Sequence, residues 1–548
     1  MTTLRFLLSA CIIIGMLALR WQPTLPDQPV ADVAQRPNML WLSCEDMSPH
    51  LGCYGDSTVP TPNLDRLARE GVRFTNAFCT AGVCAPSRNA IITGMYQTAT
   101  GGHNMRTLAN TFPEKTGLPR AYSIVPPPAV RAFPEYLRAN GYYCTNNEKT
   151  DYQFDAPPTV WDETSPRAHW KNRADGQPFF AVFNNIVTHE SQVWARAKLP
   201  LRVSPDRIQI PAYYPDTKTV RQDMARHFSN IADMDSWVGT MLKELEENGL
   251  LANTIIFFWS DHGDGLPFVK RELYDRGLRV PLLVRFPNRK NAGTTRSDLV
   301  SMIDLAPTVL TLAGLPTPKQ MQGQALFAKN GGTSGNPPRR YVFAARDRMD
   351  TEYDRVRAVH DGRYEYIRNF LPEKPLYQDL DYRKQQPMMA ELLRLRDEGR
   401  LNTVQMQWFR PTKPAEELYD LKTDPYQLHN LAADAAFAPQ LKRLQQAFAQ
   451  WQHTVPDFGA IPEKELIRQW WHGADKPPIT ADPTLARVNG RLQIQCPTEG
   501  ASIGYRIGNE TTGWRVYTGP FVVAPATKIS CLAQRIGYQK SNEVVATL

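Results

Sequence analysis

Four short apolar runs, widely spaced along the 548 residues, constrain the fold of this chain more than any other feature. They cover residues 38–43, 141–145, 178–183 and 253–259. Continuous apolar runs of this length are typical of strands buried on both faces of a parallel sheet. Helical patterns lie between them, one from about 223 to 249 and one over 61–71, where we expect Thr61 to cap the first turn and Gly71 to end the helix. This alternation predicts an α/β fold with a mixed, mostly parallel central sheet flanked by helices.

The pattern changes in the second half of the chain. After an expected helix over 300–314, residues 341–345, 363–367 and 417–421 have the character of short strands and predict a smaller antiparallel sheet. From about residue 481, apolar and polar residues alternate between Gly-containing turns, which predicts a terminal β-sandwich. We therefore expect a large α/β domain over 36–335, a C-terminal subdomain over 336–475 and a β-sandwich module over 481–548.

The first 22 residues predict export. Arg5 precedes an apolar stretch over 6–19 that is shorter than the roughly 20 residues needed to span a bilayer. We interpret residues 1–22 as a signal peptide, with an uncleaved N-terminal anchor as the alternative, because no small-residue cleavage site follows. Residues 8–11 also resemble a lipoprotein processing box that ends at Cys11. We expect a periplasmic or extracellular protein that contacts the membrane only through this segment, and only if the segment is not cleaved.

The net charge and the cysteines limit which binding partners and which disulfides we expect. The net charge is +8, from 63 Lys and Arg against 55 Asp and Glu, but the basic residues are dispersed, so no nucleic-acid partner is predicted. Export permits disulfides. A Cys496–Cys531 bridge is the favoured pairing because both residues fall in the predicted terminal module, and unpaired buried thiols are the alternative.

Ionisable side chains follow each of the four predicted core strands. In chain order these side chains are Glu45 and Asp46, Lys149 and Asp151, His189, and Asp261 and His262. In open α/β sheets, ligands bind at the carboxyl ends of the strands. The sequence therefore predicts one functional site at that edge of the sheet.

Two features of this edge indicate its chemistry. Glu45, Asp46 and Asp261 would repel one another unless a cation joined them, and oxygen ligands favour Ca²⁺ or Mg²⁺, although the neighbouring His262 also suits zinc. Cys84 precedes a helical pattern over 86–94, and a helix N-terminus favours an anion and lowers the pKa of a thiol. A cysteine nucleophile is therefore one hypothesis for Cys84.

Six motifs, in this order along the chain, resemble those of type I sulfatases of the alkaline phosphatase-like superfamily. They are PNMLWLSCED (37–46), TPNLDRLA (61–68), CAPSR (84–88), SDHG (260–263), IDLAPT (303–308) and ELYDL (417–421). The resemblance covers roughly residues 36 to 435 and is closest to a branch resembling heparan N-sulfatases. It implies an alkaline phosphatase-like α/β core, a bound Ca²⁺ rather than Mg²⁺, and oxidation of Cys84 to formylglycine, whose hydrated form attacks sulfur.

The resemblance also implies roles for individual residues. Glu45, Asp46, Asp261 and His262 look like the metal ligands, joined by the modified Cys84. Catalytic roles are implied for Arg88, which would hold the formylglycine, for Lys149 and Lys270, which would neutralise the sulfate oxygens, and for His189 as general acid. His103 and Asp151 are expected to contact substrate. Two positions depart from the common pattern, since Glu45 replaces an aspartate and Asp151 replaces a histidine.

We therefore predict an exported, Ca²⁺-dependent sulfatase that acts on a sulfated oligo- or polysaccharide. Its maturation would require a formylglycine-generating enzyme or an anaerobic sulfatase-maturating enzyme. One alternative is a phosphodiesterase or phosphonate hydrolase of the same superfamily. A second, from a different class, is a non-catalytic glycan-binding envelope protein in which Cys84 stays a thiol.

Overall fold

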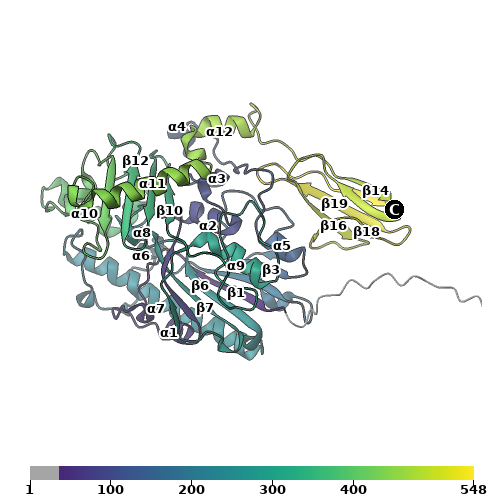
Figure 1. Ribbon diagram of the computed structural model, residues 1–548, viewed down its shortest axis with the longest axis horizontal. Coiled ribbons are helices and arrows are strands. Elements are labelled where there is room, and N and C mark those ends of the chain that lie inside the picture. The colour runs from purple at the N-terminus through teal and green to yellow at the C-terminus, as the bar shows by residue number, and fades with distance from the viewer. Residues whose placement is uncertain (1–35) are drawn as a thin grey trace, which may run out of the picture. The chain divides into compact units, whose positions relative to one another are not determined.

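The computed structural model describes residues 36–548 and is built around one large sheet (Figure 1). The strand order of this sheet is β4-β3-β5-β1-β6-β7-β2-β8, with β9 beside β2. Its strands are β1 (Asn38–Cys44), β2 (Val72–Phe78), β3 (Tyr143–Asn147), β4 (Glu163–Thr164), β5 (Phe179–Asn185), β6 (Thr254–Ser260), β7 (Arg279–Arg285), β8 (Thr294–Arg296) and β9 (Val300–Ser301). Only β7 runs antiparallel to its neighbours β6 and β2. The predicted mixed, mostly parallel sheet is confirmed.

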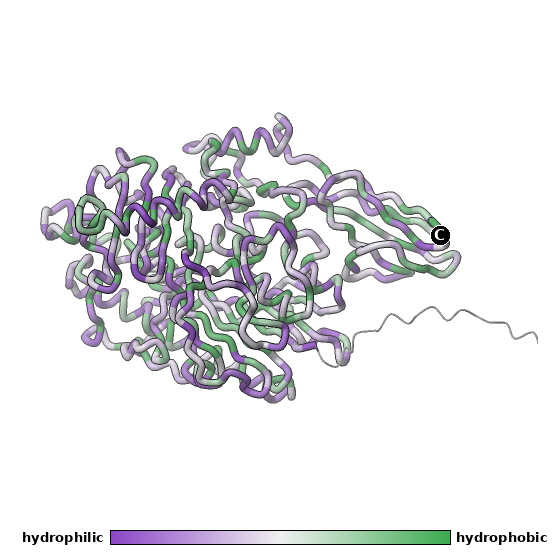
Figure 2. The backbone as a smooth tube through the Cα atoms, viewed as in Figure 1, coloured by the Kyte–Doolittle hydropathy of each residue, from purple (hydrophilic) through white to green (hydrophobic). Residues whose placement is uncertain are grey.

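The four apolar runs form β1, β3, β5 and β6, which are adjacent in the sheet. Figure 2 shows apolar residues concentrated along these central strands. The sequence pattern missed β7, because Pro281 interrupts its apolar run and cannot donate to a sheet hydrogen bond. The partner strand β2 changes register between Phe74 and Ala77. At this irregularity the Tyr54 hydroxyl donates to Phe74 O (2.8 Å) and accepts from Leu282 N (2.9 Å), which joins the two strands.

Helices cover both faces of the sheet. In Figure 1, α1 and α7 lie together on one side, and α2 and α9 lie on the other. The helices are α1 (Pro62–Arg69), α2 (Cys84–Thr93), α3 (Gln97–Thr100), α4 (Pro113–Thr116), α5 (Pro134–Arg138), α6 (Ser191–Ala195), α7 (Lys218–Glu247), α8 (Asp275–Leu278), α9 (Leu305–Leu312), α10 (Pro387–Asp397), α11 (Ala438–Thr454) and α12 (Glu463–Trp470). No helix among residues 36–548 is both long and apolar enough to cross a bilayer. The predicted export segment and Cys11 lie outside the described residues.

One predicted helix cap and one predicted helix boundary differ from the structure. Thr61 is the N-cap residue of α1, as predicted, but its side chain does not cap the helix, because its hydroxyl accepts from Gly52 N at 2.9 Å instead. The helix expected over 300–314 is shorter, since Val300 and Ser301 form β9 and a capping box between Ser301 and Asp304 starts a 3₁₀ turn before α9.

The predicted smaller antiparallel sheet follows and has four strands, in the order β10-β11-β12-β13. Its strands are β10 (Val342–Arg346), β11 (Val356–His360), β12 (Tyr364–Asn369) and β13 (Glu416–Asp420), and α11 packs on β11 and β12. The last part of the chain forms two further antiparallel sheets, which share an apolar core and confirm a β-sandwich. They contain β14 (Thr484–Val488), β15 (Arg491–Gln495) and β18 (Phe521–Val522), and β16 (Ser502–Ile507), β17 (Arg515–Val516), β19 (Lys528–Gln534) and β20 (Val544–Thr547).

The predicted Cys496–Cys531 bridge is wrong. Both cysteines are free, as are the other five cysteines in the described part of the chain. Cys496 follows β15 in one sheet of the sandwich, where its thiol contacts Ala481 O at 3.2 Å. Cys531 lies in β19 of the other sheet and is fully buried in the core. Their placement in opposite sheets separates the two thiols.

Candidate active site

The carboxyl ends of β1 and β6 bring four predicted metal ligands together. The two strands are parallel neighbours in which Cys44 pairs with Ser260, so the residues that follow each strand meet at one edge. Asp46 N donates to Asp261 Oδ1 at 3.2 Å, and His262 Nε2 lies 3.0 Å from Asp46 Oδ1. The four ligands, Glu45, Asp46, Asp261 and His262, are fully buried.

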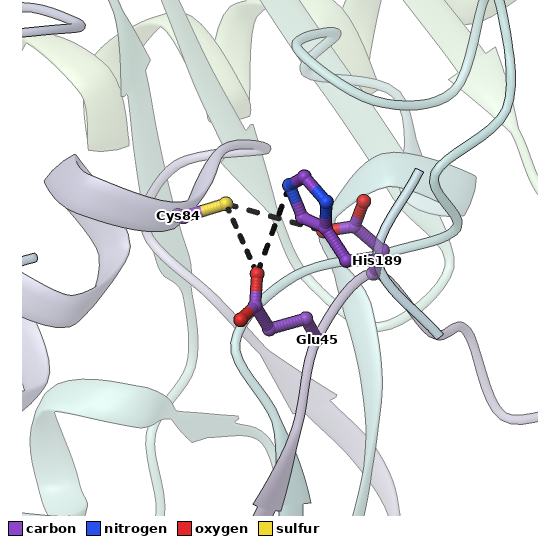
Figure 3. Close-up of side chains that lie close together, drawn as sticks. Glu45, Cys84 and His189 are labelled. Carbon is purple, nitrogen blue, oxygen red and sulfur yellow. Dashed lines mark hydrogen bonds and ion pairs between the residues drawn. The ribbon is translucent and has the colours of Figure 1, made fainter. Parts of the chain in front are cut away.

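Cys84 is the first residue of α2 and points at this cluster. Its Sγ lies 3.3 Å from His262 Nε2 and 3.9 Å from Glu45 Oε2 and from Asp46 Oδ1. Figure 3 shows Cys84, Glu45 and His189 converging from a helix start and two loops. Burial raises the pKa of the thiol, but the positive charges of Lys270 and Lys149 outweigh burial and lower the pKa to about 7. The helix N-terminus favours negative charge at the same point.

Three cations of the predicted set surround the carboxylates. Lys149 Nζ lies 2.8 Å from Glu45 Oε2, and Lys270 Nζ lies 2.6 Å from Asp46 Oδ2. Arg88, on α2, donates from Nε to Asp261 Oδ2 at 2.9 Å. The three positive charges that the sequence grouped therefore lie around one cluster of carboxylates.

The donor set fits a divalent cation. Glu45 Oε1 is buried and has no hydrogen-bond partner among the described residues. One ligand atom each from Glu45, Asp46, Cys84 and His189 lies within 4.8 Å of the others, and Cys84, Asp261 and His262 form a second such group. Carboxylate oxygens in this number suit Ca²⁺ or Mg²⁺. A bound cation would satisfy the unpartnered oxygen of Glu45.

His189 lies at the edge of the cluster, where solvent reaches it. Its Nδ1 lies 2.8 Å from Ser191 Oγ, and its Nε2 lies 3.8 Å from Glu45 Oε2. Burial and Lys270 lower the pKa of the imidazole, but Asp46, the Cys84 side chain and Glu45 together outweigh them, so the pKa is raised. A protonated imidazole facing a cavity is suited to donate a proton.

A cavity of about 350 Å³ opens above Cys84. Four predicted residues line it: Cys84, Lys149, Asp151 and His189. Lys149 Nζ also lies 3.1 Å from Asp151 Oδ2, so the aspartate that departs from the common pattern pairs with the lysine. Arg106 and Tyr382, which the sequence did not single out, complete one wall.

His103 does not line this cavity. Its side chain is 2% exposed, and burial and Arg357 lower its pKa to about 4. The loop that carries it packs against the C-terminal subdomain, where Met105 N donates to Arg348 O at 2.8 Å. This packing turns His103 inward and presents Arg106 to the cavity, so the structure gives no support to the predicted substrate contact of His103.

Sequence analysis missed several supporting residues. Glu190 accepts two hydrogen bonds from Arg271, at 3.0 and 2.6 Å, and lies 3.0 Å from Lys270 Nζ. Asn184, at the end of β5, accepts from Arg88 Nη1 at 2.7 Å. Glu190 directly follows His189 in the sequence, and Asn184 lies near the carboxyl end of β5. A search of strand ends and of the neighbours of predicted residues could therefore have identified both.

Gly265 permits the close packing around Asp46. A Cβ atom at this position would lie 2.6 Å from Asp46 Oδ2 and 2.9 Å from Glu190 Cα. Any larger residue would therefore displace the carboxylate.

Comparisons with known proteins agree with this geometry. A family model described as Sulfatase matches residues 37–315, and one described as N-sulphoglucosamine sulphohydrolase, C-terminal, matches residues 263–411. An ulvan-active sulfatase of Formosa agariphila is 46% identical over 549 residues, which cover 93% of this chain and 91% of that protein. The N-sulphoglucosamine sulphohydrolase of Homo sapiens is 26% identical over 466 residues, with 77% and 90% covered.

Solved structures share the fold at lower identity. One is a protein in complex with its substrate D-glucosamine-2-N,6-O-disulfate, with a TM-score of 0.54, 20% identity, and coverage of 77% of this chain and 99% of that one. Another is the phosphonate monoester hydrolase of Agrobacterium radiobacter, with a TM-score of 0.51, 18% identity, and coverage of 76% and 96%. The two likenesses concern the fold alone.

Proposed function

The chain belongs to the sulfatase family of sulfuric ester hydrolases, and we propose that it removes sulfate from a sulfated saccharide with Cys84 as the precursor of its nucleophile. The observation that carries this proposal is the position of Cys84, at a helix N-terminus and facing both carboxylates and lysines. The saccharide is inferred from relatives named for their action on ulvan and on N-sulphoglucosamine.

Two groups beyond the encoded side chains complete the site in this proposal. Formylglycine made from Cys84 would supply a hydroxyl nucleophile in its hydrated form. Ca²⁺ held by Glu45, Asp46, Asp261 and His262 would act as a Lewis acid at the reacting oxygens. The unpartnered Glu45 Oε1 supports a cation at this point.

The side chains of the chain itself bind the sulfate and move the proton. Lys149 and Lys270 place positive charge near Cys84 and would stabilise the oxygens that gain charge in the transition state. Arg88 links Asp261 to Asn184 and fixes the helix start. His189 lines the cavity beside Cys84, and its Nε2 would donate a proton to the leaving oxygen or nitrogen.

Export and maturation belong to the same proposal. The N-terminal segment would direct the chain to the periplasm or the cell exterior. A formylglycine-generating enzyme or an anaerobic sulfatase-maturating enzyme would oxidise Cys84 before activity appears. The CAPSR motif at 84–88, which resembles the sulfatase signature, supports this step.

The test is release of inorganic sulfate from ulvan oligosaccharides and from N-sulphoglucosamine, with the matching phosphate esters assayed in parallel. The proposal expects sulfate release that is lost in Cys84→Ala. Faster turnover of phosphate esters would favour the phosphonate hydrolase alternative. Saccharide binding without any release by the matured protein would favour a glycan-binding protein.

A further inference from the structure

The cavity is lined by an arginine and a tyrosine ring that the proposed chemistry does not use. The guanidinium carbon of Arg106 lies 5.3 Å from the centre of the Tyr382 ring. Tyr382 also meets Trp194 edge to face, with 5.5 Å between ring centres. Arg106 and Tyr382 line the same cavity as Cys84, although Tyr382 lies nearly 300 residues later in the chain.

The backbone around both residues is fixed relative to Cys84. Residues next to them in sequence belong to one buried cluster, which consists of Val83, Ala85, Met105, Met349 and Leu380. Arg348 donates from Nη1 to Met105 O at 2.9 Å and from Nη2 to Arg106 O at 3.0 Å. The start of α2, the Arg106 loop and the segment before Tyr382 therefore pack against one another.

The charge of Arg106 is only partly compensated. Its Nε lies 3.4 Å from Asp350 Oδ1, and within residues 36–548 this nitrogen has no hydrogen-bond partner. The side chain is 33% exposed, whereas that of Asp350 is 9% exposed. A planar guanidinium with open donors, facing a cavity, is suited to bind a carboxylate or a sulfate through two hydrogen bonds.

The cavity has room for more than the sulfate that reacts. Its volume of about 350 Å³ lies in the range of sites that hold small organic ligands. Lys149, His189, Arg106 and Tyr382 line this cavity together with Cys84, and the centres of the His189 and Tyr382 rings lie 6.3 Å apart. A sugar held with its sulfate at Cys84 would therefore present other substituents to Arg106 and Tyr382.

We propose that Arg106 binds a second anionic group of the saccharide, a carboxylate or another sulfate, while the Tyr382 ring packs against the sugar that carries it. This inference rests on the proposed function, since it assumes a saccharide in the cavity. It adds to that function a preference for saccharides with two anionic groups, because a substrate with only one would bind more weakly.

Calorimetric binding to the Cys84→Ala protein tests this without dependence on turnover. The probes are a sulfated disaccharide with a uronate, its carboxyl-reduced counterpart, and a disulfated disaccharide with its monosulfated counterpart. We expect loss of the second anion to raise Kd at least tenfold, which corresponds to about 1.4 kcal/mol. The pair that shows the larger effect identifies the anion as carboxylate or sulfate.

The substitution Arg106→Gln, made in the Cys84→Ala protein, is the second part of this binding test. We expect it to weaken binding of the doubly anionic probe at least tenfold more than binding of its singly anionic counterpart. The matched control is Arg506→Gln, which removes an arginine placed over the Trp514 ring in the terminal sandwich. Equal affinities within both probe pairs would overturn the inference even if Arg106→Gln failed to fold. Absence of sulfate release by the matured enzyme would instead contradict the proposed function.

Discussion

The Lys270 ammonium lies 2.6 Å from Asp46 Oδ2 and 3.0 Å from Glu190 Oε1, in a position where all three side chains are at most 2% exposed. Such a buried cation between two carboxylates holds Asp46 in place while adding positive charge beside Cys84. Lys270→Ala should reduce kcat by about 10²–10³-fold, the usual cost of removing one charge-stabilising group from a transition state. Steady-state sulfate release measures this. The control is Lys171→Ala, an exposed lysine paired with Glu244, which should retain normal turnover.

Gly265 should be intolerant of a single methyl group. In Gly265→Ala the new Cβ would meet Asp46 Oδ2, and a displacement of about 1 Å in a catalytic group can cost on the order of 10²-fold in rate. Gly335→Ala is the matched control, since no atom lies within 4 Å of its added Cβ. Turnover and melting temperature should be measured together. A variant with normal turnover would show that Asp46 need not be held in this position.

Removal of the metal should lower stability as well as activity. A cation that binds only the folded state stabilises it by about 2.7 kcal/mol when its concentration is a hundred times Kd. Chelation should therefore lower the melting temperature, and added Ca²⁺ should restore it. Glu45→Gln should weaken this response, while Glu247→Gln, at an exposed helical position, should leave it intact. An identical melting temperature with and without chelator would argue against a cation at Glu45.

The buried carboxyl group of Asp223, on α7, should make the stability of the folded protein depend on pH. Burial raises the pKa of its carboxyl to about 7, although Met388 N donates to it at 2.6 Å. Because the folded pKa lies above the unfolded one, this group contributes most to stability below pH 4, and that contribution is lost as the pH rises to about 7. Asp223→Asn should remove the loss and stabilise the protein at pH 8 by at most about 4 kcal/mol, at about 1.4 kcal/mol per pKa unit.

Urea unfolding of Asp223→Asn at pH 4 and pH 8 checks this expectation. The two proteins should have similar stability at pH 4 and diverge at pH 8. The exposed Asp175→Asn should follow the wild type at both pH values. A variant that is less stable than the wild type at pH 8 would show that the buried carboxylate is stabilised by its surroundings.

The sequence grouped the residues around Cys84 but missed two other residues that line the cavity, for a physical reason. Strand ends are visible as breaks in an apolar run, so Glu45, Asp46, His189 and Asp261 could be grouped from the amino-acid pattern alone. Tyr382 and Arg106 belong to irregular segments whose meeting depends on packing between distant parts of the chain. The inward turn of His103 was equally hidden, because it follows from the contact of its loop with Arg348.

The missed strand β7 and the incorrect disulfide prediction also have structural explanations. β7 escaped detection because its pairing tolerates Pro281 through an irregularity in β2, which no local pattern reports. The predicted disulfide failed since proximity in sequence says little about which sheet of a sandwich a strand joins. Cys496 and Cys531 lie 35 residues apart in the chain but in opposite sheets.

The most direct test of the central claim is the mass of the peptide that contains residue 84, from protein purified from its native host. If Cys84 is the precursor of the nucleophile, that peptide should be lighter than the encoded sequence by the difference between a thiol and an aldehyde, and sulfate release should scale with the modified fraction. An unmodified Cys84 in fully active protein would contradict the account.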